Sequence, residues 1–181
     1  RGGQAYIVYP LVEESEKVEL RAATAEYERL ASEVFPDLRV GLLHGQMPGE
    51  EKDAVMRAFS AGELDIVVST TVIEVGIDVP NATIMVIEHA ERFGLSQLHQ
   101  LRGRVGRGAE KSYCILLSGG DEEAAERLRI FASTEDGFEI ARADLRLRGM
   151  GDFFGARQHG VPEFRYFDPS RDEPLLARAR A

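Results

Sequence analysis

Residues 38–69 read LRVGLLHGQMPGEEKDAVMRAFSAGELDIVVS, and the order of patterns within this stretch indicates an α/β fold. Apolar and polar residues alternate from Leu38 to Leu43, which predicts a strand. Pro48 suits the first turn of a helix that runs to Ser60, and Gly62 closes that helix. The short apolar run Asp65–Ser69 is typical of a buried strand. Strands that alternate with helices favour a parallel sheet covered by helices.

The segments on either side repeat this alternation. Further strands are expected at residues 5–9, 83–88 and 112–117, and further helices at 15–35 and 95–101. The helix at 15–35 is expected to bury Val18, Ala22, Ala25, Leu30 and Val34.

The chain changes character after Gly119 and Gly120. Residues 121–133 and 137–147 predict two helices joined by a short link, which is a helical hairpin. Residues 148–160 read RGMGDFFGARQHG, and so many glycines without a period predict a loop. We therefore expect an α/β domain over residues 1–120, and a second unit over residues 121–181 that holds the hairpin, the glycine-rich loop and a polar tail.

Composition narrows the function classes. The chain has 181 residues, 44% of them hydrophobic, and a formal net charge of −9. The acidic total weakens a nucleic-acid-binding interpretation, but residues 92–111 carry five Lys or Arg against one acid, Glu110. No apolar run approaches the roughly 20 residues that span a bilayer. The single cysteine, Cys114, lies in an apolar run and is expected to be a buried structural thiol. With one cysteine and scattered histidines, no metal site is expected.

Residues 97–107 read QLHQLRGRVGR and place three arginines beside two glycines. Guanidinium groups stay charged and match phosphate oxygens two at a time. Gly103 and Gly106 have no side chain, so a ligand can approach the backbone closely there. Such a cluster suits charge stabilisation on a transferring phosphoryl group. The alternative is a solvated arginine turn at a helix end.

Residues 70–80 follow a predicted strand and supply threonine hydroxyls and a carboxylate, in addition to the arginines of residues 97–107. Thr70 and Thr71 can bond a nucleic-acid phosphate, and Asp78, close to Gly76, can accept hydrogen bonds from a ribose hydroxyl. The alternative is that Asp78 only shapes a turn. Each of the three lysines follows a glutamate, so the chain has no Walker A loop. The pattern therefore indicates half of a nucleotide site.

These motifs resemble a known family. TTVIEVGID at residues 70–78 and QLHQLRGRVGR at 97–107 resemble motifs five and six of superfamily 2 helicases, in the order found in their second RecA-like lobe. DLRLRGMGDFFGARQHG at residues 144–160 is similar to the RecG family of bacterial ATP-dependent helicases, which remodel branched DNA and stalled forks. Transcription-repair coupling factors share motif six and this last stretch. VYPLVEES at residues 8–15 and ERFGLSQ at 91–97 favour RecG.

The resemblance implies roles for individual residues. Arg104 and Arg107 would be arginine fingers and Gln100 would couple the nucleotide to motif six. Gly76 and Asp78 would face the nucleotide, and Thr70 would contact DNA. The translocation motif would use three residues of the second unit: Arg127, Arg148 and Gln158.

The same resemblance implies cofactors and partners. ATP with Mg²⁺ would be bound mainly by a first lobe that this chain lacks, so the chain is expected to be a fragment and inactive alone. Branched or forked DNA and the first lobe of the same polypeptide are the expected partners, in a monomer of the bacterial cytoplasm without a membrane. The alternatives are the motor lobe of a coupling factor and a non-enzymatic α/β module that binds nucleic acid. A Rossmann-type oxidoreductase is not favoured, because no glycine loop follows the first strand.

Overall fold

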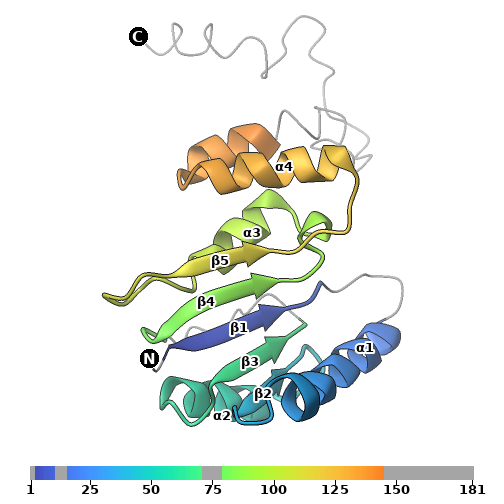
Figure 1. Ribbon diagram of the computed structural model, residues 1–181, viewed down its shortest axis with the longest axis vertical. Helices are drawn as coiled ribbons and strands as arrows, with labels where there is room; N and C mark the ends of the chain where they lie inside the picture. Colours follow the sequence, from blue (N-terminus) through green and yellow to red (C-terminus); the bar gives the residue numbers. More distant parts are fainter. Residues whose placement is uncertain (1–2, 11–15, 71–78, 145–181) are drawn as a thin grey trace, which may run out of the picture.

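The computed structural model describes residues 3–10, 16–70 and 79–144 of the chain, and these form a five-stranded sheet flanked by helices (Figure 1). The strand order is β2-β3-β1-β4-β5, and all four strand pairs are parallel. The strands are β1 Gln4–Val8, β2 Val40–Leu43, β3 Ile66–Ser69, β4 Ala82–Ile87 and β5 Tyr113–Leu116. The parallel sheet predicted from the alternating patterns is confirmed.

The helices agree with the predicted segments. They are α1 Glu16–Arg29, the π-helical turn η1 Leu30–Val34, α2 Gly49–Ser60, the 3₁₀ turn η2 Ala90–Arg92, α3 Leu95–Arg102 and α4 Glu122–Ser133. Asp121 caps α4, because its side chain accepts a hydrogen bond of 3.0 Å from the backbone N–H of Ala124. Residues 137–144 are also helical, so two helices of the predicted hairpin lie side by side (Figure 1).

Two apolar layers hold the sheet. On one face, α2 and α3 bury Met56, Phe59, Leu95, Leu98 and Leu101 against Tyr6, Val8, Val67 and Met85 of the strands. The other face carries a smaller cluster, in which Leu30 of η1 packs against Ile7, Ile66 and Val68. α4 adds Leu128 and Phe131 to the larger layer, so the hairpin continues the core of the α/β domain.

The buried face of the first helix differs from the prediction. Ala23 is buried, whereas Ala25 is exposed and Val34 is 42% exposed. Leu30 is buried as predicted, while the side chains of Val18 and Ala22 lie outside the described residues. Ala23 lies seven residues, or two helical turns, before the buried Leu30, so both lie on the same side of the helix. The exposure of Val34 has a local cause: the backbone N–H of Phe35 donates to the carbonyl of Leu30 five residues earlier, at 2.8 Å. This wider turn rotates the helix end away from the 3.6-residue period.

β5 is an edge strand in the described sheet, and its burial is lower than the apolar sequence suggests. Tyr113 is 52% and Ile115 is 45% exposed. Cys114 is half-buried rather than buried, and this burial raises the pKa of its thiol. Within the described ranges, no group of His, Cys, Asp and Glu could hold a metal ion, and none of the described helices is long and apolar enough to cross a membrane.

Candidate functional site

The predicted arginines lie on a loop at the amino-terminal edge of the sheet. α3 runs back from the carboxyl end of β4, so residues 103–108, called the arginine loop below, come after its last turn and precede β5. α3 is fixed by three fully buried leucines, Leu95, Leu98 and Leu101. Gln97 is used at the start of α3, where its Oε1 accepts a hydrogen bond of 2.9 Å from the N–H of Gly94. The loop therefore extends from an anchored helix.

Two glycines shape the arginine loop for different reasons. Gly106 has φ +81°, a conformation that side chains other than glycine's rarely adopt. A Cβ on Gly108 would stand 2.6 Å from the carbonyl oxygen of Pro80, so the loop lies directly against Pro80. Gly103 ends α3 with φ −68°, which any residue adopts. Close packing against Pro80 explains why residue 108 is a glycine, and the positive φ explains why residue 106 is one. Neither reason applies to Gly103.

Arg104 and Arg107 belong to this loop, and Gln100 lies on the last turn of α3, which precedes it. Gln100 and Arg107 are exposed and Arg104 is half-buried. The Nε of Arg107 donates to the carbonyl of Gly103 at 3.0 Å, which orients the guanidinium along the loop. Because guanidinium groups bind phosphate oxygens through paired donors, these residues suit one side of a polyphosphate. The chemistry of Gln100, Arg104 and Arg107 therefore fits contact with the phosphate groups of a nucleotide.

Arg102, the first arginine of the cluster, is directed elsewhere. Its Nη1 donates to the carbonyl of Thr134 at 2.7 Å, and its guanidinium carbon lies 4.5 Å from the centre of the Phe131 ring. It therefore binds the end of α4 rather than sharing the arginine loop. The sequence pattern grouped all three arginines together, and this long-range contact could not be read from it.

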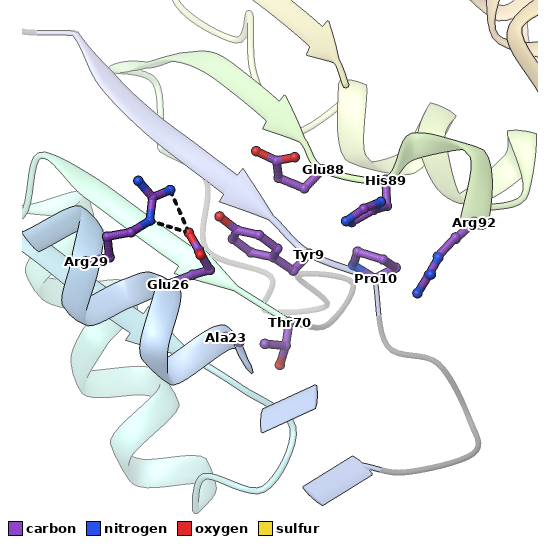
Figure 2. A pocket seen from close by; sticks show the side chains of 9 residues that line it. All are labelled: Tyr9, Pro10, Ala23, Glu26, Arg29, Thr70, Glu88, His89 and Arg92. Carbon is purple, nitrogen blue, oxygen red and sulfur yellow. Dashed lines mark hydrogen bonds and ion pairs between the residues drawn. The ribbon is translucent and has the colours of Figure 1, made fainter. Parts of the chain in front are cut away.

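A second polar region lies at the opposite, carboxyl-terminal edge of the sheet. A cleft of about 410 Å³ opens there between the strand ends and α1 (Figure 2). Thr70 lies at its floor and is 3% exposed. The cleft is lined by Tyr9, Pro10, Ala23, Glu26, Arg29, Thr70, Glu88, His89 and Arg92. Strand ends of β1, β3 and β4 thus bring residues from distant parts of the sequence together.

Charges of both signs line this cleft. Arg29 is paired with Glu26 at 2.7 Å, as the dashed lines in Figure 2 show. Burial, together with the carboxylates of Glu26 and Glu88, raises the pKa of Tyr9 to about 12, so its hydroxyl stays protonated at neutral pH. Arg92 is exposed at the rim. No role for Tyr9 or Arg92 follows from the motifs of the sequence. The one signal that points to them is their position shortly after the ends of predicted strands.

His89 opens the segment between β4 and α3 and has an uncommon backbone. Its φ is +48°, in the left-handed region. The Nδ1 of His89 lies 3.4 Å from a carboxylate oxygen of Glu91. Despite burial, which alone would raise it, the pKa of Glu91 lies below its usual value because hydrogen bonds from the backbone, Ser118 and His89 stabilise the carboxylate. Glu91 is therefore a structural carboxylate of this segment.

The two regions lie at opposite edges of the sheet. Thr71, Gly76 and Asp78 lie outside the described residues. The residues that flank them are described: Thr70 lies at the carboxyl end of β3, and Val79 precedes the amino end of β4. The chain therefore connects the cleft to the side that holds the arginine loop.

The residues predicted for translocation are described in part. Arg127 is half-buried on α4, and its Nη2 donates to the backbone carbonyl of Glu91 in η2. Arg148 and Gln158, with the whole glycine-rich loop, lie outside the described residues. α4 thus contacts the segment that leads into α3 from one side and Arg102 from the other.

Comparisons with known proteins bear on the family and the fold of this chain. Residues 1–109 match the helicase conserved C-terminal domain, and residues 134–181 match the C-terminal part of domain 3 of the ATP-dependent DNA helicase RecG. The ATP-dependent DNA helicase RecG of Thermotoga maritima is 59% identical over 99% of this chain and 23% of its own length. The RecG of Bacillus subtilis is 54% identical over 99% of this chain and 26% of its own length. The chain spans about a quarter of the length of these relatives.

Solved structures show the same fold. A RecG bound to a three-way DNA junction matches 97% of this chain and 22% of its own chain, with 54% identity and a TM-score of 0.72. The C-terminal domain of the DEAD-box protein Dbp5 matches 81% of this chain and 71% of its own, with 22% identity and a TM-score of 0.51. The second likeness bears on the fold alone. The predicted RecA-like sheet and the predicted resemblance to RecG are both confirmed.

Proposed function

This chain belongs to the helicase conserved C-terminal domain family, and we propose that it is the second motor lobe of an ATP-dependent DNA helicase that remodels branched DNA and stalled forks. The observation that carries the proposal is the arginine loop, which holds Arg104 and Arg107 at one edge of the sheet, while Thr70 lies in a cleft at the other. A motor lobe needs both a nucleotide side and a nucleic-acid side. In this proposal the edge with the arginine loop is the nucleotide side, and the edge with Thr70 is the nucleic-acid side.

On the nucleotide side, Arg104 and Arg107 act as arginine fingers towards ATP held by another lobe of the same polypeptide, and Gln100 connects them to the nucleotide. Mg²⁺ and the triphosphate are bound mainly by that other lobe, and a bound nucleotide supplies the phosphoryl group. Gly76 and Asp78 face the same nucleotide, which is supported by the contact of Gly108 with Pro80, two residues after Asp78. An arginine finger contributes roughly 10³-fold or more in rate.

On the nucleic-acid side, Thr70 and Thr71 bond the DNA backbone at the carboxyl edge. In this proposal the chain has two units. Residues 1–120 form the motor lobe, and residues 121–181 form the translocation unit, which uses Arg127, Arg148 and Gln158. Nucleotide-driven movement between the two lobes is passed to the hairpin and loop, which move duplex DNA. The intact protein acts as a monomer in the bacterial cytoplasm, where chromosomal DNA forms branches.

The test is ATP hydrolysis by the intact protein with forked DNA. Arg104→Gln should lower DNA-stimulated kcat by roughly 10³-fold, with fork binding retained. Arg129→Gln is the matched control, because Arg129 is an exposed arginine of α4 paired with Glu122 and Glu126. This chain alone should not hydrolyse ATP. Full turnover by Arg104→Gln would refute the role of Arg104 as an arginine finger. Fork binding without any ATP hydrolysis by the wild type would instead favour a non-enzymatic nucleic-acid-binding module.

A further inference from the structure

We propose that Arg102 is a positioning residue that joins the arginine loop to the helical hairpin, so that a displacement of the loop moves α4. This inference rests on the proposed function, because it assigns the connection between the nucleotide side and the translocation unit. Arg102 is the last residue of α3, and Gly103, the first residue of the arginine loop, follows it directly.

The guanidinium of Arg102 is held by three contacts with α4. Its Nη1 donates to the carbonyl of Thr134 at 2.7 Å and to the carbonyl of Phe131 at 3.3 Å. Its carbon lies 4.5 Å from the centre of the Phe131 ring, within the range of a cation–π contact. These carbonyls are at the C-terminal end of α4, where the helix dipole is negative. The cation therefore binds the end of α4 through both its charge and its flat face.

The second helix of the hairpin also lies close to these contacts. The Nη2 of Arg102 lies 3.2 Å from Nδ1 of His99, one turn earlier on α3. A Cβ on Gly137, the first residue of the second helix, would stand 3.1 Å from Nε2 of His99. The hairpin is thus packed closely against the last turn of α3, at the point where the arginine loop begins.

The contact with the Phe131 ring favours an arginine here. A lysine ammonium carries the charge and could donate to both carbonyls, which accept from the single atom Nη1 of Arg102, but it has no flat face to stack on Phe131. Phe131 is 1% exposed, so its ring cannot turn away to follow a different side chain. Stacking on Phe131 accounts for the arginine at position 102, which lies outside the arginine loop although Arg104 and Arg107 of that loop follow it closely in sequence.

α4 has a second anchor, which makes it suited to move as one body. Arg127, one turn before Phe131, donates to the carbonyl of Glu91 in η2. Asp121 caps its first turn. Because η2 leads directly into α3, Arg127 and Arg102 join α4 to the same segment of the chain at two points. A shift of this segment therefore displaces the whole of α4 rather than its last turn.

The experiment compares fork unwinding with ATP hydrolysis in the intact protein, on the same samples. Arg102→Met should leave kcat and KM for ATP hydrolysis near the wild-type values, while unwinding per ATP hydrolysed falls by about tenfold or more. One hydrogen bond from a charged group corresponds to roughly tenfold, and this variant loses two of them together with the ring contact. Arg102→Lys should lie between the two. Arg129→Met is the matched control on α4 and should change neither quantity. A purely structural role would lower hydrolysis and unwinding together.

A second variant keeps the test independent of folding. Phe131→Leu removes the ring beneath the guanidinium but keeps an apolar side chain, and it should lower the same ratio. In the double variant with Arg102→Met, Phe131→Leu should cause no further fall in the ratio, because both changes break the same contact between α3 and α4. Additive losses, an unchanged ratio, or a loss of hydrolysis equal to that of Arg104→Gln would overturn the proposal. A wild-type protein without DNA-stimulated hydrolysis would refute the proposed function instead.

Discussion

Gly106→Ala should destabilise the protein, whereas Gly103→Ala, three residues earlier in the same motif, should not. Gly106 has φ +81°, and a residue with a Cβ pays about 1–2 kcal/mol for a left-handed backbone. A Cβ there would stand 3.5 Å from Ser112, which is ordinary contact, so the backbone alone sets this cost. Gly103 has φ −68°, and its nearest neighbours would also be 3.5 Å away. Alanine at Gly103 should stabilise by about 0.4–1 kcal/mol, because it restricts the unfolded chain.

The assay is urea unfolding of the two variants and the wild type, followed by ATP hydrolysis by the intact protein. For a chain of this size, a change of 1 kcal/mol corresponds to about 2–4 °C in Tm, which gives a second readout. Gly106→Ala should lower both Tm and ATP hydrolysis, since the alanine displaces Arg107 together with the loop. Equal destabilisation by the two alanines would refute this assignment, because the structure gives them different backbones.

Gly103→Ala also tests the prediction made from the motif. The motif indicates that Gly103 and Gly106 let a ligand approach closely, and the positive φ of Gly106 gives that glycine another reason. If Gly103→Ala keeps its stability but loses ATP hydrolysis, then Gly103 is the position where the ligand comes close. Normal hydrolysis by this variant would remove Gly103 from the candidate site.

Two further predictions concern the lobe itself. Gln4→Met should cost about 1–3 kcal/mol in the free energy of unfolding, because the buried Nε2 of Gln4 donates to the carbonyls of Phe59 and Leu64, both at 2.6 Å, and these would lose their donor; a loss below about 0.5 kcal/mol in urea unfolding would contradict this. Hydrogen bonds from Arg39 lower the pKa of Asp65 from 3.8 to about 2, so its contribution to stability is present above pH 3.8 and is lost as the pH falls through 2. Asp65→Asn should therefore flatten the dependence of Tm on pH in this window, and an unchanged acid profile would show that the exposed pair contributes nothing.

Much of the fold follows from local patterns. The strand, helix and strand within residues 38–69 differ from the structure by no more than the usual uncertainty of element ends, because a four-residue buried strand and a helix with Pro48 at its start are encoded by neighbouring residues. The buried face of the first helix was less predictable. Ala23 is buried because it lies two helical turns before the buried Leu30, on the same side of the helix, and Ala25 lies on another side. The π-turn at Leu30–Val34 then breaks the helical period and leaves Val34 exposed.

The sequence by itself determined the family, the parallel sheet and the presence of an arginine cluster beside glycines, since each depends on residues close together in the chain. Only the tertiary structure decided how the cluster is divided. Arg102 and Arg104 are two residues apart, yet Arg102 binds the carbonyl of Thr134, thirty-two positions away, while Arg104 belongs to the arginine loop. Neighbours at the end of a helix point in different directions, and which of them meets another helix depends on where the chain returns. That position is fixed by packing of the hairpin against α3, which local sequence does not encode.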